Sequence, residues 1–233
     1  MQKQNHWIRT YMLIAACFLL IAYGGDRTVT VIAEITPIGR KHCFIIDPGH
    51  GGEDGGATSC TGQLESMYNL EIAQRLNDLL SLLGYNTKMT RSEDISIYTK
   101  GETLSQKKRS DLQERVRIVN ETEGAILLSI HQNIFTSSSS SGSQVFYSEA
   151  PGSKALAEKL QDALIVNLSH KSNRSVKKGS GIYLMEHISC PGVLIECGFI
   201  SNPEENSKLG NPVYQKKLCC IIAATAGQYI SNS

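Results

Sequence analysis

The fold is decided by one stretch of the chain, Cys43-Phe-Ile-Ile-Asp-Pro-Gly-His50-Gly-Gly-Glu-Asp-Gly-Gly-Ala57. Its first part is a short apolar run that stops at Pro48-Gly49, which predicts a buried strand of about 4–6 residues followed by a turn. His50 then lies just past the carboxyl end of that strand. The glycines that follow allow the backbone to take positive φ or to pass close to a ligand. A histidine in this position is a candidate metal ligand, although a lone histidine is a weak signal.

A helix and a second strand are expected after this loop. Five residues keep the i, i+3/i+4 spacing of one buried stripe: Ile72, Leu76, Leu79, Leu80 and Leu83. Gly84 is placed to end this helix, and residues 85–90 then predict a strand. The order of strand, loop, helix and strand is the signature of a βαβ unit and predicts a largely parallel sheet.

The remaining chain continues this alternation. Further strands are expected at 125–130, 144–147, 182–185 and 193–196, and further helices at 111–121, 153–169 and after Pro203 and Pro212. Segment 92–110 is polar and is expected to be a surface excursion, with Lys107-Lys108-Arg109 as a solvated face. We therefore predict an α/β fold, a single domain with a twisted, mostly parallel sheet of about six strands flanked by helices.

Composition and the N-terminus limit where the protein works. Lys and Arg number 23 against 22 Asp and Glu, and this near-balance argues against a nucleic-acid partner. Residues 11–23 form an apolar run after a basic start, so 1–25 is expected to be a signal peptide or an N-terminal membrane anchor. Both alternatives place the rest of the chain outside the cytoplasmic membrane, either secreted or anchored. The N-terminal segment is the sole expected link to the membrane. Residues 26–41 are expected to be a linker, and 42–233 the catalytic domain.

Four side chains are candidates for chemistry at one edge of the sheet. His50, His131 and Glu196 come at strand ends, and Glu65 comes at the start of the first helix. Ligands of open α/β sheets bind outside the carboxyl ends of the strands. Two imidazoles and a carboxylate with an open fourth position are typical of a catalytic zinc site, and a second carboxylate can act as the base toward bound water.

Several segments carry a resemblance to a known family. They are Ile46-Asp-Pro-Gly-His-Gly-Gly52 with Asp54-Gly-Gly-Ala57, Glu65 with Asn69-Leu70, Thr90-Arg91, Leu112-x-x-Arg115 with Asn120, Ser129-Ile-His-x-Asn133, and Val193-Leu-Ile-Glu-Cys-Gly-Phe-Ile-Ser-Asn-Pro-Glu-Glu205. The chain resembles the zinc-dependent N-acetylmuramoyl-L-alanine amidases of type 3, which cleave bacterial peptidoglycan. Its short length and single N-terminal apolar segment are most similar to the sporulation and germination amidases that act on spore cortex.

The resemblance implies a role for each matching position. His50, Glu65 and His131 would bind Zn²⁺, and Glu196 would be the catalytic carboxylate. The reaction implied is hydrolysis of the amide bond between N-acetylmuramic acid and L-alanine in cell wall or spore cortex by a zinc-activated water.

Two further residues are candidate substrate contacts. Asn133 could bind substrate or a ligand, or it could be a turn-former after a strand. Arg115 could meet a peptide carboxylate of the substrate, or it could belong to a structural ion pair.

The chain departs from the family pattern away from the proposed ligands. Ser66 stands where lysine is usual, the run from Asp54 to Ala57 has glycine where proline is common, and Val119 replaces an alanine. Three alternatives stay open: another zinc amide hydrolase acting on the wall, a non-catalytic wall-binding protein, and an enzyme that needs an activating protein partner to load zinc or present substrate.

Overall fold

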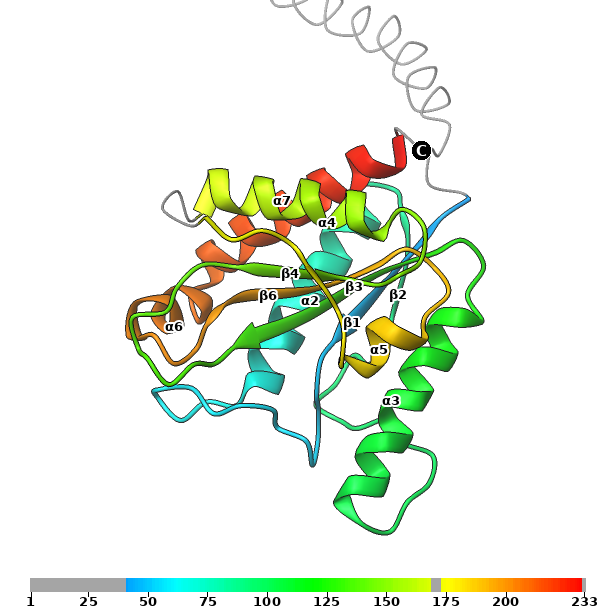
Figure 1. Ribbon diagram of the computed structural model, residues 1–233, viewed down its shortest axis with the longest axis horizontal. Helices are drawn as coiled ribbons and strands as arrows, with labels where there is room; N and C mark the ends of the chain where they lie inside the picture. Colours follow the sequence, from blue (N-terminus) through cyan, green and yellow to red (C-terminus); the bar gives the residue numbers. More distant parts are fainter. Residues whose placement is uncertain (1–40, 169–172, 232–233) are drawn as a thin grey trace, which may run out of the picture. The chain divides into compact units, whose positions relative to one another are not determined.

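A six-stranded sheet forms the centre of the computed structural model, which describes residues 41–168 and 173–231 (Figure 1). Its strands are β1 (Cys43–Pro48), β2 (Asn86–Met89), β3 (Ala125–Asn133), β4 (Gln144–Tyr147), β5 (Lys177–Lys178) and β6 (Gly192–Phe199), in the order β2-β1-β3-β6-β4-β5. The pairs β2–β1, β1–β3, β3–β6 and β4–β5 are parallel, and β4–β6 is antiparallel. The predicted α/β fold with a mostly parallel sheet is confirmed.

Helices cover both faces of this sheet. They are α2 (Glu65–Leu82), α3 (Leu104–Asn120), α4 (Ser153–Leu168), α5 (Tyr183–His187), α6 (Pro203–Leu209) and α7 (Pro212–Ser231). Helix α7 packs against α2 and α4, whereas α3 packs against α5. Figure 1 shows α4 and α7 on one side of the sheet and α3 and α5 on the other.

The strands contribute side chains to two separate apolar clusters, because successive side chains of a strand point to opposite faces of the sheet. Phe44 and Ile46 of β1 join the larger cluster with α2, α4 and α7, while Ile45 joins the smaller cluster with α3 and α5. In β3, Ile130 points to the larger cluster. His131 is the next residue, so the same alternation turns it toward the side of α3 and α5.

Helix α3 begins at Leu104, seven positions before the predicted start at 111, so the helix start was missed, although most of 104–110 is exposed as expected of a surface excursion. The start is a capping box: the Thr103 side chain accepts a hydrogen bond from the backbone N–H of Gln106 at 3.3 Å, and the Gln106 side chain accepts one from the backbone N–H of Thr103 at 3.2 Å. Spacing of apolar residues misses this part because its face toward the protein is polar.

The strand predicted at 182–185 is also wrong, because Tyr183–His187 forms the short helix α5. Leu184 and Met185 pack into the smaller apolar cluster. A short apolar run cannot be assigned to helix or strand by periodicity alone. Leu83, expected in the buried stripe of α2, is 56% exposed.

The predictions for the N-terminus lie outside the described residues. These are the signal peptide or anchor at 1–25 and all but the last residue of the linker at 26–41. Within the part of the chain that is described, no helix is long and apolar enough to cross a membrane.

Candidate metal centre

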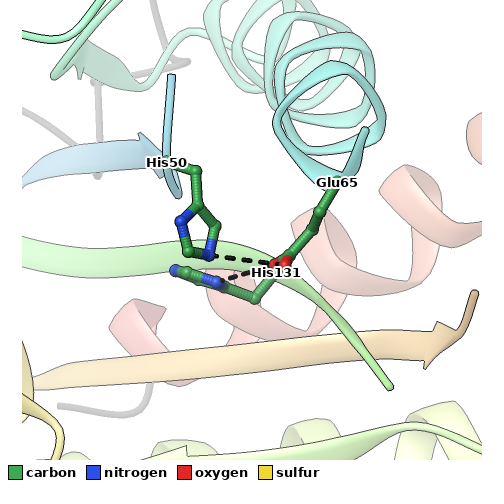
Figure 2. A group of neighbouring side chains, drawn as sticks. All are labelled: His50, Glu65 and His131. Atoms are coloured by element: carbon green, nitrogen blue, oxygen red, sulfur yellow. Dashed lines mark hydrogen bonds and ion pairs between the residues drawn. The ribbon is translucent and has the colours of Figure 1, made fainter. Parts of the chain in front are cut away.

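His50, Glu65 and His131 converge at the carboxyl edge of the sheet, and Figure 2 shows the three side chains pointing toward one another. Each offers one ligand atom, and these atoms lie within 4.8 Å of one another. His50 Nε2 is 3.4 Å from Glu65 Oε2, and His131 Nδ1 is 3.1 Å from Glu65 Oε1. The two imidazole rings lie edge to face with their centroids 5.0 Å apart. The structure therefore brings together the three predicted ligands.

Parallel pairing and a loop–helix junction create this convergence. Pro48 of β1 pairs with Ile130 of β3, so His50, which follows the end of β1, lies beside His131, which is still within β3. The backbone N–H of Glu65 donates to the carbonyl of Ala57 at 2.8 Å, which ties the start of α2 to the glycine-rich loop. Residues far apart in the sequence thus meet at one rim, as expected for strand ends in an α/β fold.

Two glycines of the loop have no side chain where the three candidate ligand side chains pack against the backbone. A Cβ atom at Gly49 would lie 2.1 Å from His131 Nε2. Gly56 has a φ of +68°, and a Cβ atom there would lie 2.7 Å from both Glu65 Oε2 and His50 Cδ2. Any larger residue at either position would push a ligand away, so the glycines belong to the site.

His50 has a φ of 61° and is the one non-glycine residue with positive φ among the described residues. Two arginines hold the carbonyl groups around it. Arg115 donates to the carbonyl of His50 at 2.8 Å, and Arg91 donates to the carbonyls of Pro48 and Gly49, each at 3.0 Å. A strained backbone of this kind persists only where its surroundings determine it strongly.

Arg115 is buried between two carboxylates, with Nη1 at 2.5 Å from Asp47 and Nε at 2.6 Å from Asp111. Burial alone would raise the pKa of Asp47, but Arg115 and hydrogen bonds from Thr90 and Ser129 outweigh it and lower that pKa to about 2. These contacts support the structural ion pair. A contact between Arg115 and substrate stays a prediction that this geometry does not favour.

Glu65 is held as an ionised carboxylate. Its oxygens accept hydrogen bonds from the backbone N–H groups of Ala57 and Gln132 and from the side chain of Asn69. Burial would raise the pKa of Glu65, but His131 and His50 outweigh it and hold that pKa below its usual range. A carboxylate that keeps its negative charge is the form that binds a cation.

Asn69 connects all three ligand segments, a role that sequence reasoning did not assign. Its side chain donates to the carbonyl of Gly49 at 3.1 Å and to Glu65 at 3.3 Å, and it accepts from Gln132 at 3.1 Å. Gly49 and Gln132 are the chain neighbours of the two histidines. The available signal was the spacing of four residues after Glu65, which places both side chains on one face of a helix.

Glu196 lies beside the group without belonging to it. It pairs in register with His131 on the neighbouring strand, and its Oε2 atom is buried with no hydrogen-bond partner in the described chain. Burial and, to a smaller extent, the charge of Glu65 outweigh the lowering effect of His131 and raise the pKa of Glu196 to about 7. A carboxylate with that proton affinity can both take and return a proton near neutral pH.

Asn133 ends β3 just past a register shift that follows His131. Its carbonyl accepts a hydrogen bond from the backbone N–H of Ile200 at 2.9 Å, and its half-buried side chain makes no hydrogen bond within the described residues. A contact with substrate stays a prediction.

The donor set suits a divalent transition metal. Two imidazole nitrogens and one carboxylate oxygen are the ligands of many catalytic zinc sites, which keep a further position open. The pKa of His50 is raised to about 9, because hydrogen bonds to Asp54 and Glu65 outweigh the lowering effect of burial. A metal ion must therefore displace a proton from His50 at neutral pH. The site has ligands for a cation beside a carboxylate whose pKa is raised.

Comparison with known sequences identifies relatives along nearly the whole chain. A family model described as N-acetylmuramoyl-L-alanine amidase matches residues 44–226. The germination-specific N-acetylmuramoyl-L-alanine amidase of Bacillus subtilis strain 168 is 36% identical over 225 residues, which cover 95% of this chain and 93% of that protein. The amidase LytC of the same organism is 38% identical over 177 residues, 75% of this chain but 32% of LytC.

Comparison with solved structures agrees with the sequence match. The CwlD amidase from Clostridioides difficile, solved in complex with the GerS lipoprotein, superimposes with a TM-score of 0.78 at 34% identity, covering 82% of this chain and 100% of that chain. The amidase AmiC2 of Nostoc punctiforme superimposes with a TM-score of 0.70 at 29% identity and covers 83% of this chain.

Proposed function

The chain belongs to the N-acetylmuramoyl-L-alanine amidase family, and from that premise we propose that it hydrolyses peptidoglycan with zinc. The bond cleaved joins N-acetylmuramic acid to L-alanine. The observation that carries the zinc proposal is the convergence of His50, Glu65 and His131 beside Glu196, whose buried Oε2 atom has no partner in the described chain. The family match favours this reaction over another wall amide hydrolase and over a non-catalytic wall-binding protein.

The ligand residues would hold the metal, and the chemistry that zinc supplies when bound is to lower the pKa of water toward about 7 and to polarise a carbonyl group. His50 and His131 would each offer one ring nitrogen, His50 after losing a proton, and Glu65 would supply the negative charge. Asn69 and the glycine-rich loop keep these three side chains in place before the ion arrives. Little reorganisation is then needed on binding.

Glu196 is the proton carrier of the proposed mechanism. Its carboxylate accepts a proton as water attacks the amide carbonyl, and it then donates that proton to the departing amine of L-alanine. Burial and the lack of a hydrogen-bond partner raise the pKa of this carboxylate, which favours uptake of the proton in the first step. No serine or cysteine nucleophile is required.

Separate substitutions test the two roles. We expect His50→Ala or His131→Ala to lose zinc and activity together. We expect Glu196→Gln to keep zinc and to lose about 10²- to 10⁴-fold in hydrolysis, the usual contribution of a general acid–base group. Zinc content by elemental analysis and mass spectrometry of digested peptidoglycan are the measurements. The reaction should release intact peptides from intact glycan, and a metal-free Glu196→Gln protein would move that residue into the ligand set.

We propose spore cortex as the physiological substrate. The support is the germination-specific amidase of Bacillus subtilis, of which the chain covers 93%. Purified cortex peptidoglycan should be cleaved faster than vegetative wall by the same preparation. Equal rates on both, or faster cleavage of vegetative wall, would remove the germination role and leave the amidase activity standing.

We further propose export through residues 1–25, as a cleaved signal or as an anchor, and action with a protein partner. The partner is supported by the CwlD amidase, whose structure contains the GerS lipoprotein. Zinc content and activity of the purified chain should rise when an extract of the producing cells is added. A lone chain already saturated with zinc and fully active would count against the partner.

A further inference from the structure

Asp54 is a second carboxylate that reaches His50 from the side of the ring opposite Glu65. Its Oδ2 atom lies 2.9 Å from His50 Nδ1, whereas His50 Nε2 lies 3.4 Å from Glu65 Oε2. An ionised carboxylate can only accept a hydrogen bond, so Nδ1 keeps a proton to donate to Asp54, and Nε2 is the nitrogen left to bind a metal ion once it has given up its own proton. Asp54 thereby selects the nitrogen that faces the other ligands.

The position of Asp54 is set by a tight turn in the glycine-rich loop. The backbone N–H of Gly51 donates to the carbonyl of Asp54 at 2.8 Å, and the N–H of Asp54 donates back at 3.2 Å. The Oδ1 atom accepts from the N–H of Gly56 at 3.3 Å, which leaves Oδ2 for His50. The loop therefore folds Asp54 back toward Nδ1 of the histidine that it follows.

Lys108 holds Asp54 from outside the loop. Its Nζ atom lies 3.1 Å from Asp54 Oδ2, and the preceding Lys107 binds both oxygens of Glu53 at 2.8 and 3.0 Å. Two neighbouring carboxylates of the loop thus meet two neighbouring lysines of α3. These lysines lie in the part of α3 that sequence analysis assigned to a surface excursion, so the two ion pairs are a product of the fold.

The two histidines are oriented by different means. His131 faces Glu65 through Nδ1, and its Nε2 lies against Gly49 with no hydrogen bond in the described chain. His50 has a polar partner on each nitrogen. A cavity of about 90 Å³ is lined by both histidines together with Asp54 and Lys108, so this ion pair borders the metal centre itself.

We propose that Asp54 and Lys108 are positioning residues of the metal centre. Asp54 fixes the ring orientation and the tautomer of His50, and Lys108 makes that alignment depend on the docking of α3 against the loop. Second partners of metal-bound histidines act in this way in many metalloproteins. The inference rests on the proposed zinc site, because it concerns how readily that site accepts the ion.

Zinc affinity of the full chain, measured by competition with a chelator, is the main test. We expect Asp54→Ala to weaken zinc binding about 10- to 100-fold. Asp54→Asn keeps an acceptor for Nδ1 and should lose less. Lys108→Met should weaken binding about two- to fivefold, as expected for a partly exposed ion pair. Lys107→Met is the matched control: it breaks the neighbouring ion pair with Glu53 and should leave zinc affinity unchanged.

A double variant shows whether Lys108 acts through Asp54. Asp54→Ala combined with Lys108→Met should bind zinc as weakly as Asp54→Ala alone, because the lysine then has no carboxylate to hold. If the losses of zinc affinity in the two single variants add fully in the double variant, Lys108 acts separately from Asp54, and its proposed action through Asp54 is overturned. If Asp54→Ala fails to fold, Asp54→Asn replaces it in the same cycle.

A spectroscopic readout separates positioning from a general structural role. In the zinc-loaded protein labelled with ¹⁵N-histidine, the Nδ1–H proton of His50 should be protected from exchange with water. Asp54→Ala should lose that protection, Lys107→Met should keep it, and the metal-free variants should unfold at the same denaturant midpoint as the wild type. Zinc affinity of Asp54→Ala within threefold of wild type would overturn this inference alone, whereas a wild-type chain that binds no zinc would overturn the proposed function.

Discussion

Two regions of this sheet, called here the apolar side and the catalytic edge, are stabilised by different kinds of interaction. The apolar side is the layer of α2, α4 and α7 against the sheet, where Leu80, Leu160 and Ile222 are fully buried. The catalytic edge is the set of strand ends around His50, Glu65, His131 and Glu196, together with the charged side chains that hold them. The first is stabilised by burial of apolar area, and the second by directional hydrogen bonds and ion pairs.

The difference teaches where substitutions should be tolerated. Burial of apolar surface is non-directional, so removing one side chain from the apolar side costs stability without moving distant groups. At the catalytic edge, Arg115 contacts Asp47, Asp111 and the carbonyls of Pro48 and His50. Removing one member of such a network leaves several buried partners unpaired.

Arg115→Met should have the largest effect on stability. We expect it to lower the free energy of unfolding by about 3–5 kcal/mol, because a buried Asp47 is left without its counter-charge. It should also weaken zinc binding about 10- to 100-fold, since the carbonyl of His50 loses its donor. Urea unfolding and chelator competition are the measurements.

The matched change on the apolar side is Leu160→Ala, with a cost of about 2–5 kcal/mol and unchanged zinc affinity in the folded protein. An equal loss of affinity in both variants would erase the distinction.

Gly49→Ala should damage the catalytic edge while sparing the apolar side. The new Cβ atom would lie 2.1 Å from His131 Nε2, so the ring must move. We expect zinc affinity to fall at least about 100-fold, the upper range for changes around a metal ligand. Gly210→Ala is the control, because its Cβ atom would meet neighbours only at 3.6 Å or more. Chelator competition compares the two, and tight zinc binding by Gly49→Ala would contradict the role given to this glycine.

The pH dependence of stability should also differ between the two regions. The pKa of Asp47 is about 2 in the folded protein against an ordinary 3.8. A lowered pKa stabilises the folded state above the ordinary value, here by about 2 kcal/mol, and this is lost as pH falls through 2. The stability difference between wild type and Asp47→Asn should therefore shrink by about 1 kcal/mol between pH 7 and pH 3. The difference between wild type and Leu160→Ala should stay constant, and parallel behaviour of the two pairs would refute the assignment.

The smallest expected effect is that of a substitution at Leu83, at the end of α2, where the apolar side ends. Leu83 is 56% exposed although its spacing in α2 predicted burial, whereas Leu80 is fully buried. We expect Leu83→Ala to change the free energy of unfolding by less than about 0.5 kcal/mol and Leu80→Ala to reduce it by about 2–5 kcal/mol. Urea unfolding of the pair is sufficient. A large cost at Leu83 would mean that the apolar side extends beyond the end of the helix.

The success of sequence reasoning follows the same division. The strands at 43–48, 86–89 and 144–147 and the stripe of α2 were predicted because apolar periodicity is a local signal. The starts of α6 and α7 were predicted from Pro203 and Pro212, which lie at the first position of each helix. Two failures, 104–110 and 182–185, lie on the side of α3 and α5: the first is a polar helix start, and the second is a short apolar run that periodicity cannot assign. The third failure, Leu83, lies at the end of α2.

The residues of the candidate site were predicted from the sequence, but the residues that hold them in position were not. His50, His131 and Glu196 stand after or within recognisable strands, and Glu65 starts a helix, so their meeting at one rim followed from the topology. Asp54 and Asn69 had no assigned role, and Lys108 was expected on a solvated face. The spacing of four residues between Glu65 and Asn69 was a local signal, whereas no local pattern identifies the partner of Lys108. The contact between Lys108 and Asp54 joins residues 54 positions apart.

The sequence by itself determined the alternation of strands and helices, the family and the set of residues that could hold a metal, since these depend on residue type and spacing along the chain. Only the tertiary structure decided which nitrogen of each histidine faces Glu65, why two glycines must stay glycine, and which charges hold the positive-φ backbone of His50. Those features depend on distances of a few ångströms between segments far apart in the chain, and such distances exist only once the sheet and its helices have packed.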